Sequence, residues 1–187
     1  MTTNLYLVRH AHSTYTPDEL GRPLSVQGLK DAETVTKLLK NVQVDKVISS
    51  PYKRAKQTVE GIAEHIGQEI EMMDAFKERR LAEESVEDFH TAIAKVWEDE
   101  TFSWKGGESN LVAQRRGVEA IHQLLKKYNG KSIVIGTHGN IMVLIMNYFD
   151  QSYNFKFWQE LEMPDIYQLT FNEEFLIRVR RVWEGNY

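Results

Sequence analysis

Hydrophobic and polar residues alternate along this chain with two different periods, which predicts strands and helices in alternation. Leu5–Val8 is a short unbroken apolar run, typical of a strand that is covered on both faces. Residues 25–40 instead carry apolar side chains at three- and four-residue spacing, which predicts an amphipathic helix. Residues 45–50 predict a second strand, and residues 53–67, ending at a glycine, predict a second helix.

The second half of the chain continues the alternation. Residues 68–73 suggest a short strand, and Ser85 with Asp88 resembles a capping box that opens a helix over 85–97. Ser109 is expected to cap the next helix, which Asn129-Gly130 ends. The remaining predicted elements are a central strand at Ser132–Gly136, a buried helix over 140–149 and an antiparallel hairpin over 166–182.

Strands that alternate with helices predict the fold class. We expect an α/β protein, a three-layer α/β/α sandwich with a largely parallel central sheet and an antiparallel C-terminal edge hairpin. The length of 187 residues fits one domain with a sizeable core.

Composition narrows the classes of function. The net charge is −4, which argues against a general nucleic-acid-binding or anionic-membrane-binding protein, since such proteins usually carry a basic surplus. The chain has no cysteine, which excludes disulfides, thiolate metal sites and cysteine nucleophiles. No apolar run approaches the roughly 20 residues of a membrane span, and residues 1–10 do not resemble a signal peptide. A soluble protein of the cytoplasm is therefore expected.

Basic side chains and histidines follow three of the predicted parallel strands. Arg9 and His10 follow the first strand, Arg54 comes shortly after the second, and His138 with Gly139 follows the strand at 132–136. Ligands of open α/β sheets bind beyond the carboxyl ends of the strands, so these groups should meet at one edge. The sequence therefore predicts a phosphate site there.

The residue types suit phosphoryl transfer. Guanidinium groups bind phosphoryl oxygens in bidentate fashion, and neutral imidazole is a competent nucleophile towards phosphorus. Arg9, Arg54 and His138 can supply the positive environment around the transferred group without a metal ion or other cofactor. Glu78 lies on a connecting segment that could overhang the same edge, and it is the candidate acid for the leaving oxygen.

Four motifs in the order in which they occur resemble those of the histidine phosphatase superfamily, also described as phosphoglycerate mutase-like. The resemblance covers residues 5 to about 140, and the motifs are LVRHAHS, SSPYKRAKQT, GGES and GTHGN. It implies that His10 becomes phosphorylated, that Arg9, Arg54 and His138 hold the phosphoryl group, and that Glu78 donates a proton. It implies no cofactor and no metal, and one domain over 1–187 with a small insertion around 74–107 that covers the site.

The match departs from the family pattern at several positions. Ala11 replaces the usual glycine after the nucleophile, and Thr16 stands where an asparagine often contacts phosphate. Ser13, Thr16 and Gly139 are expected to border the bound phosphate. Glu83 and Glu84 remain alternatives to Glu78 as the acid. Four further arginines are expected to be surface charges, although one pair could select an anionic part of the substrate: Arg79, Arg80, Arg115 and Arg116.

The leading hypothesis is a metal-independent phosphatase that releases inorganic phosphate from a small phosphorylated metabolite. One alternative is a mutase that returns the phosphoryl group to a bound product, although the segment between the acid and GGES is short for enclosing a substrate. Further alternatives are a phosphatase acting on phosphohistidine or other phosphoproteins, and a non-catalytic module that binds phosphate. The identity of the substrate and the oligomeric state stay open.

Overall fold

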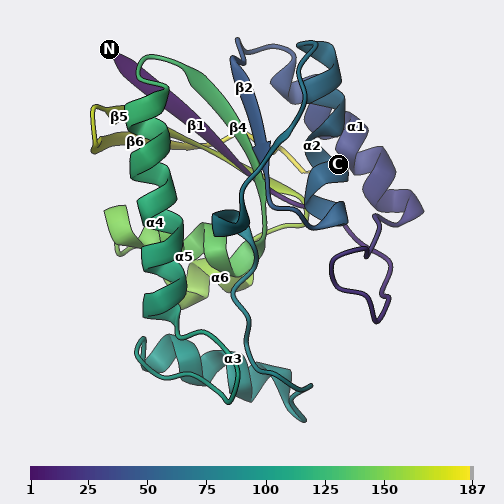
Figure 1. The fold of residues 1–187 in the computed structure, drawn as a ribbon, viewed down its shortest axis with the longest axis vertical. Helices are drawn as coiled ribbons and strands as arrows, with labels where there is room; N and C mark the ends of the chain where they lie inside the picture. Colours follow the sequence, from purple (N-terminus) through teal and green to yellow (C-terminus); the bar gives the residue numbers. More distant parts are fainter. Residues whose placement is uncertain (186–187) are drawn as a thin grey trace.

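The computed structural model describes residues 1–185, and its elements follow the predicted alternation (Figure 1). The elements in chain order are β1 (Thr2–Arg9), α1 (Val26–Leu39), β2 (Lys46–Ser49), α2 (Lys53–His65), β3 (Glu71–Met72), the 3₁₀ helix η1 (Asp74–Phe76), α3 (Phe89–Glu98), α4 (Asn110–Lys127), β4 (Ser132–Thr137), α5 (Gly139–Phe149), α6 (Phe155–Glu160), β5 (Asp165–Asn172) and β6 (Phe175–Arg181).

A six-stranded sheet with the order β3-β2-β4-β1-β5-β6 forms the centre of the structure. β3, β2, β4 and β1 pair in parallel, whereas β5 is antiparallel to β1 and β6 is antiparallel to β5. The prediction of a largely parallel sheet with an antiparallel C-terminal edge is confirmed.

Side chains of the sheet alternate between two cores, because successive residues of a strand point to opposite faces. Leu5 and Leu7 of β1 belong to one core with α4 and α5, and Tyr6 and Val8 belong to the other with α1 and α2. Figure 1 shows α1 and α2 on one side of the sheet and α4, α5 and α6 on the other. The short α3 lies at the end of the molecule towards which the parallel strands run. This arrangement is the predicted three-layer sandwich.

Caps fix where the helices start. Ser25 accepts a hydrogen bond from the Gly28 N–H, and Ser109 accepts one from the Val112 N–H, as is usual for the residue before a first helical turn. The predicted start of a helix at residue 85 is wrong, because α3 begins at Phe89. Asp88 is its N-cap: the side chain accepts from the His90 and Thr91 N–H groups, so the chain before it lies outside the helix.

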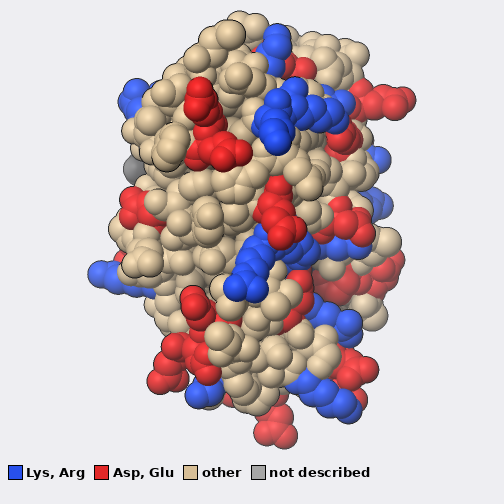
Figure 2. Space-filling model, turned by 60° about the vertical axis from the view of Figure 1, so that its left-hand side comes forward, with Lys and Arg blue, Asp and Glu red and all other residues tan. Residues whose placement is uncertain are grey.

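Charges of both signs are interspersed on the face shown in Figure 2, where lysine and arginine side chains lie beside aspartate and glutamate. Among the described residues, none of the helices combines the length and the apolar character that crossing a bilayer requires.

Candidate active site

The carboxyl ends of β1 and β4 lie side by side. Arg9, the last residue of β1, is in register with Thr137, the last residue of β4. The His10 N–H donates to the Thr137 carbonyl at 3.0 Å, which extends the pairing by one residue beyond the strand. The residues that follow each strand therefore begin at the same edge, as expected for parallel strands.

The two histidines that follow these strands meet. Their ring centroids are 5.2 Å apart with an interplanar angle of 64°. His10 is 8% exposed and His138 is fully buried, so both imidazoles share one enclosed environment. The structure thus brings His10 and His138 together from distant parts of the sequence.

The hydrogen bonds of His10 define its tautomer. Its Nδ1 lies 2.7 Å from the Ala11 carbonyl oxygen, which can only accept, so Nδ1 carries the proton. Its Nε2 accepts a hydrogen bond from Arg54 Nε at 3.3 Å and therefore holds the lone pair. The pKa of His10 is lowered to about 3, chiefly by burial; the hydrogen bond to the Ala11 carbonyl opposes this change, and the positive charges of Arg54, Arg9 and Arg22 act in the same direction as burial. The imidazole is consequently neutral near neutral pH, with Nε2 as its basic atom.

His138 is neutral for a similar reason. Burial holds its pKa well below the usual range, and the neighbouring His10, Arg54 and Arg9 act in the same direction. Its Nε2 lies 2.8 Å from the Ser50 hydroxyl, which follows β2. Its Nδ1 is buried and has no hydrogen-bond partner within residues 1–185. One ring nitrogen thus anchors the side chain to the second strand while the other stays unpaired.

Arg9 is held along the start of α5. Its Nη1 donates to the carbonyl oxygens of Leu161 and Glu162 at 3.0 and 3.1 Å. A Cβ at Gly139 would lie 3.0 Å from Arg9 Nε and 3.1 Å from its Cζ, so the guanidinium packs directly on the glycine backbone. Gly139, which we expected to border a phosphate, therefore also makes room for Arg9.

Arg54 connects the first turn of α2 to His10. It is 5% exposed, and besides its contact with His10 its Nη1 donates to the Glu19 carbonyl at 2.9 Å. Its Nη2 lies 3.2 Å from a Glu19 carboxylate oxygen. Burial lowers the pKa of Arg54, and the Glu19 carboxylate opposes that change.

Glu78 lies at the N-terminus of α5. Its Oε2 accepts from the Asn140 N–H at 3.0 Å, and its Oε1 accepts from the Ile141 N–H at 3.0 Å and the Arg79 N–H at 2.8 Å. The N-terminus of a helix favours a negative charge, and α5 starts directly after His138. The Glu78 carboxylate also raises the pKa of Arg9 and of Arg54, although burial lowers both values overall. The predicted acid is therefore part of the same cluster.

The two alternative acids lie elsewhere. Glu83 and Glu84 are exposed. The Glu83 N–H donates to the Lys105 carbonyl, and a Cβ at Gly106 would lie 2.5 Å from the Glu83 Cβ. Glu78 therefore stays the candidate acid that we carry into the proposed mechanism.

An ion pair clamps the segment that carries Glu78. Arg116 binds Glu108 in bidentate fashion, with Nε to Oε1 and Nη2 to Oε2 both at 3.0 Å. Arg116 Nη1 also donates to the Ala75 and Lys77 carbonyls, at 2.7 and 3.1 Å, just before Glu78. Glu108 accepts from the Arg80 N–H at 3.2 Å, just after Glu78. Glu108 of the GGES motif thus helps to hold the chain on both sides of Glu78, whereas Ser109 beside it caps α4.

Two predicted neighbours of the phosphate are engaged within the β1–α1 connection. Ser13 forms an isolated β-bridge with Leu24, and the Thr16 hydroxyl donates to the Asp18 carbonyl at 3.0 Å.

Sequence reasoning missed Glu19 and Arg22 of the same connection, since nothing in their local pattern points to the site. The surface position expected for Arg79 is wrong: its side chain is 3% exposed, with Nε and Nη1 buried and unpaired within the described part of the chain.

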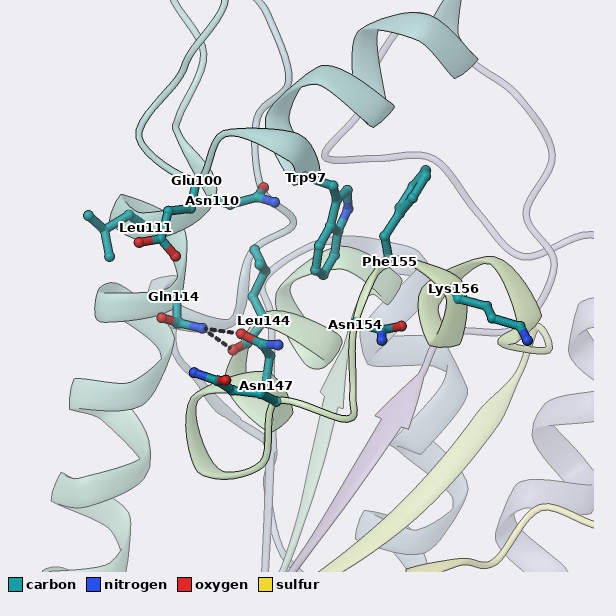
Figure 3. Close-up of a pocket in the computed structure, with 11 residues that line it drawn as sticks. Trp97, Glu100, Asn110, Leu111, Gln114, Leu144, Asn147, Asn154, Phe155 and Lys156 are labelled. Atoms are coloured by element: carbon teal, nitrogen blue, oxygen red, sulfur yellow. Dashed lines mark hydrogen bonds between the residues drawn. The ribbon is translucent and has the colours of Figure 1, made fainter.

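A cavity of about 530 Å³ lies between the end of α3 and the facing parts of α4, α5 and α6 (Figure 3). None of the predicted site residues lines it. Trp97 borders it and donates from Nε1 to the Asn140 side chain at 3.3 Å, next to the Glu78 contact. In Figure 3 the amide of Gln114 reaches the Leu144 carbonyl and Asn147, and these bonds measure 2.9 and 3.2 Å. The cavity is thus a neighbour of the histidine cluster, joined to it through Trp97 and Asn140.

Metal-binding geometry is not found in residues 1–185, where no three histidine, aspartate or glutamate side chains gather closely enough to hold an ion. The sheet order and the paired imidazoles flanked by arginines instead define an α/β protein with a two-histidine site. Residues 5–179 match the model of the histidine phosphatase superfamily, branch 1, which covers most of the chain. The protein belongs to this superfamily, and the resemblance seen in the motifs is confirmed.

Individual relatives agree with this assignment. A metal-independent phosphoserine phosphatase of Arabidopsis thaliana is 29% identical over an alignment 159 residues long that covers 75% of this chain and 66% of that protein. A mycobacterial glucosyl-3-phosphoglycerate phosphatase has the same fold, with a TM-score of 0.79, 20% identity and full coverage of both chains. A mutant phosphoserine phosphatase of Entamoeba histolytica in complex with phosphoserine gives a TM-score of 0.77 at 20% identity, with 94% of each chain covered.

Proposed function

We propose that the protein is a phosphatase that hydrolyses a small phosphorylated metabolite through a phosphohistidine at His10. The observation that carries this proposal is the state of His10: a buried, neutral imidazole whose Nε2 lone pair points to Arg54 and whose ring lies beside His138. A protonated imidazole has no lone pair on Nε2 with which to attack phosphorus. Without positive neighbours, nothing would hold the negatively charged phosphoryl oxygens beside it.

In the first step, His10 Nε2 forms a bond to phosphorus while the bond from phosphorus to the ester oxygen breaks. Arg9, Arg54 and His138 hold the phosphoryl oxygens, and the leaving oxygen takes a proton from Glu78. Oε2 of Glu78 accepts one hydrogen bond, from Asn140, so a lone pair on this oxygen is available to carry that proton.

In the second step, the Glu78 carboxylate takes a proton from a water molecule, whose oxygen attacks phosphorus. The bond between Nε2 and phosphorus breaks, inorganic phosphate leaves and His10 returns to the neutral imidazole. In this scheme Ser13, Thr16 and Gly139 border the phosphate, and residues 74–107 form a small insertion of a single domain that covers the site. Neither step needs a metal ion, in keeping with the name of the Arabidopsis relative.

Phosphate esters of small metabolites are the substrate class that this proposal favours. The two relatives named for phosphoserine and the one named for glucosyl-3-phosphoglycerate support it, since each acts on a small phosphorylated molecule.

The deciding experiment measures phosphate release from an aryl phosphate in the presence of a chelator. We expect release by the unmodified protein and its loss in His10→Ala, with a phosphorylated protein trapped by rapid quench in alkaline detergent only when His10 is present. Phosphate binding without release would favour a non-catalytic module. Exchange between phosphoglycerate isomers faster than phosphate release would favour a mutase.

A further inference from the structure

The connection between β1 and α1 places a carboxylate of the protein against the predicted phosphate site. Glu19 contacts two arginines at once: one carboxylate oxygen lies 3.2 Å from Arg54 Nη2, and the other pairs with Arg22 Nη2. The Glu19 carbonyl also accepts from Arg54 Nη1 at 2.9 Å. A single residue thus engages both terminal nitrogens of Arg54.

These contacts compete with the binding of a phosphoryl group. Arg54 Nε is directed to His10 Nε2, so a phosphoryl group that reacts at this atom lies next to the Arg54 guanidinium. The Glu19 carboxylate bridges Arg54 Nη2 and Arg22 Nη2, although each terminal nitrogen of a guanidinium carries two hydrogens and keeps a second donor. A phosphoryl oxygen that is to bridge the same two arginines must therefore displace the Glu19 carboxylate.

Arg22 lies where it can bind a phosphoryl group that replaces the Glu19 carboxylate. Its charge acts on both His10 and Arg54, lowering the pKa of each after the larger effect of burial. Its side chain is 17% exposed, and its Nε is buried without a hydrogen-bond partner among the residues that the structure describes. A third guanidinium with an unused donor therefore lies beside the two that sequence motifs identified.

We infer that Arg22 and Arg54 form an oxyanion position that Glu19 fills in the resting protein and that the phosphoryl group of the substrate takes over. The inference rests on the proposed function and adds to it a third phosphate-binding arginine and an internal competitor. The ligand class is a tetrahedral phosphoryl dianion, whether it belongs to the ester or to the inorganic phosphate product.

The exchange is physically reasonable. The Glu19 side chain is 58% exposed, and ion pairs with one exposed partner contribute little net stability. A phosphoryl dianion offers more charge and more acceptor oxygens than one carboxylate, so it binds the two arginines more strongly. Glu19 therefore weakens phosphate binding without preventing it, and it favours release of the product.

Calorimetric titration with inorganic phosphate tests the inference without turnover. Glu19→Gln should tighten phosphate binding about five-fold, because the competing ion pair is lost. Arg22→Gln should weaken it about ten-fold, both alone and in the Glu19→Gln background. Asp18→Asn is the matched control, since it removes the same charge from the neighbouring exposed residue and should leave the affinity nearly unchanged.

The outcomes separate this inference from the proposed function. If the unmodified protein binds no phosphate, the proposed function fails. If it binds phosphate but Glu19→Gln changes the affinity no more than Asp18→Asn, or Arg22→Gln has no effect, the inference is overturned while the phosphatase proposal stands. Raising the salt concentration should shrink the difference between Glu19→Gln and the unmodified protein, because a partly exposed ion pair is screened.

Discussion

At the scale of single residues, the proposed mechanism needs a neutral nucleophile beside groups that are charged. Burial among arginines lets one imidazole keep its lone pair while guanidinium groups remain nearby to receive an anion. Glu78 differs from both, because three backbone N–H groups surround its carboxylate at the start of α5. In the proposed mechanism these groups are the nucleophile, the phosphate ligands and the proton donor.

Glu78→Gln tests the proton donor. An amide cannot protonate the leaving oxygen, so hydrolysis of alkyl phosphates should slow by about 10²–10⁴-fold. Activated aryl phosphates should be affected far less, because their leaving oxygens need little protonation. Steady-state kinetics on a matched series of esters measures the contrast. Equal losses across the series would move the acid role to another residue.

The site residues that the sequence could predict are those that lie at the ends of recognisable strands. Arg9 ends β1, and His10 and His138 directly follow β1 and β4, so topology alone assigns them to one edge. Glu19 and Arg22 enter the site because the β1–α1 connection folds back onto α2, where the Leu20 carbonyl accepts from the Lys53 N–H. No periodic pattern encodes such a contact. The Arg79 side chain is buried, and Glu108 accepts from the Arg80 N–H beside it, whereas the sequence shows only a run of charges there.

At the scale of elements, two segments far apart in sequence hold the chain around Glu78. The Glu108 N–H donates to the Arg80 carbonyl at 2.7 Å, and a Cβ at Gly107 would lie 2.1 Å from the Leu81 carbonyl oxygen. The approach is so close that only glycine fits there. The GGES motif therefore packs against the residues after Glu78, and Arg116 of α4 binds the carbonyls before it.

Arg116→Met tests this clamp. Losing the bonds to Glu108 and to two carbonyls should lower the free energy of unfolding by about 1–3 kcal/mol, measured in urea. If the clamp positions Glu78, alkyl phosphates should again lose more activity than aryl phosphates, and the loss should not add to that of Glu78→Gln. Arg115→Met, at the exposed neighbouring position, is the control. Equal losses for both ester types would show a purely structural role.

At the scale of the whole molecule, the hydrophobic periodicity predicts the three layers but not every helix boundary. Apolar runs identified β1 and β4, and the wide apolar stripes of α1 and α2 placed them against the sheet. The start of α3 was missed because both Ser85 and Asp88 are good capping residues, and only tertiary packing decides between them. Strand order also lies beyond periodicity, since β4 enters between β1 and β2.

The burial of the two histidines leads to a prediction of how the free energy of unfolding of the whole protein depends on pH. In the unfolded chain His10 and His138 take up protons as the pH falls through about 6.5, whereas in the folded protein the pKa of His10 is about 3 and that of His138 is also far below 6.5. The unfolded state therefore binds more protons below this pH. Stability is fully present above about pH 6.5 and should decrease on acidification, by up to about 1.4 kcal/mol per pH unit for each histidine.

Urea unfolding at a series of pH values between about 7 and 5 measures this slope, in a window above the range where most carboxylates titrate. His10→Gln and His138→Gln should each reduce it, because the side chain that must remain neutral is gone. His65→Gln, at an exposed position of α2, should leave it unchanged. A slope that is the same in all four proteins would mean that the two imidazoles are not held neutral by the fold, and the lone pair on which phosphoryl transfer to His10 depends would then have no structural basis.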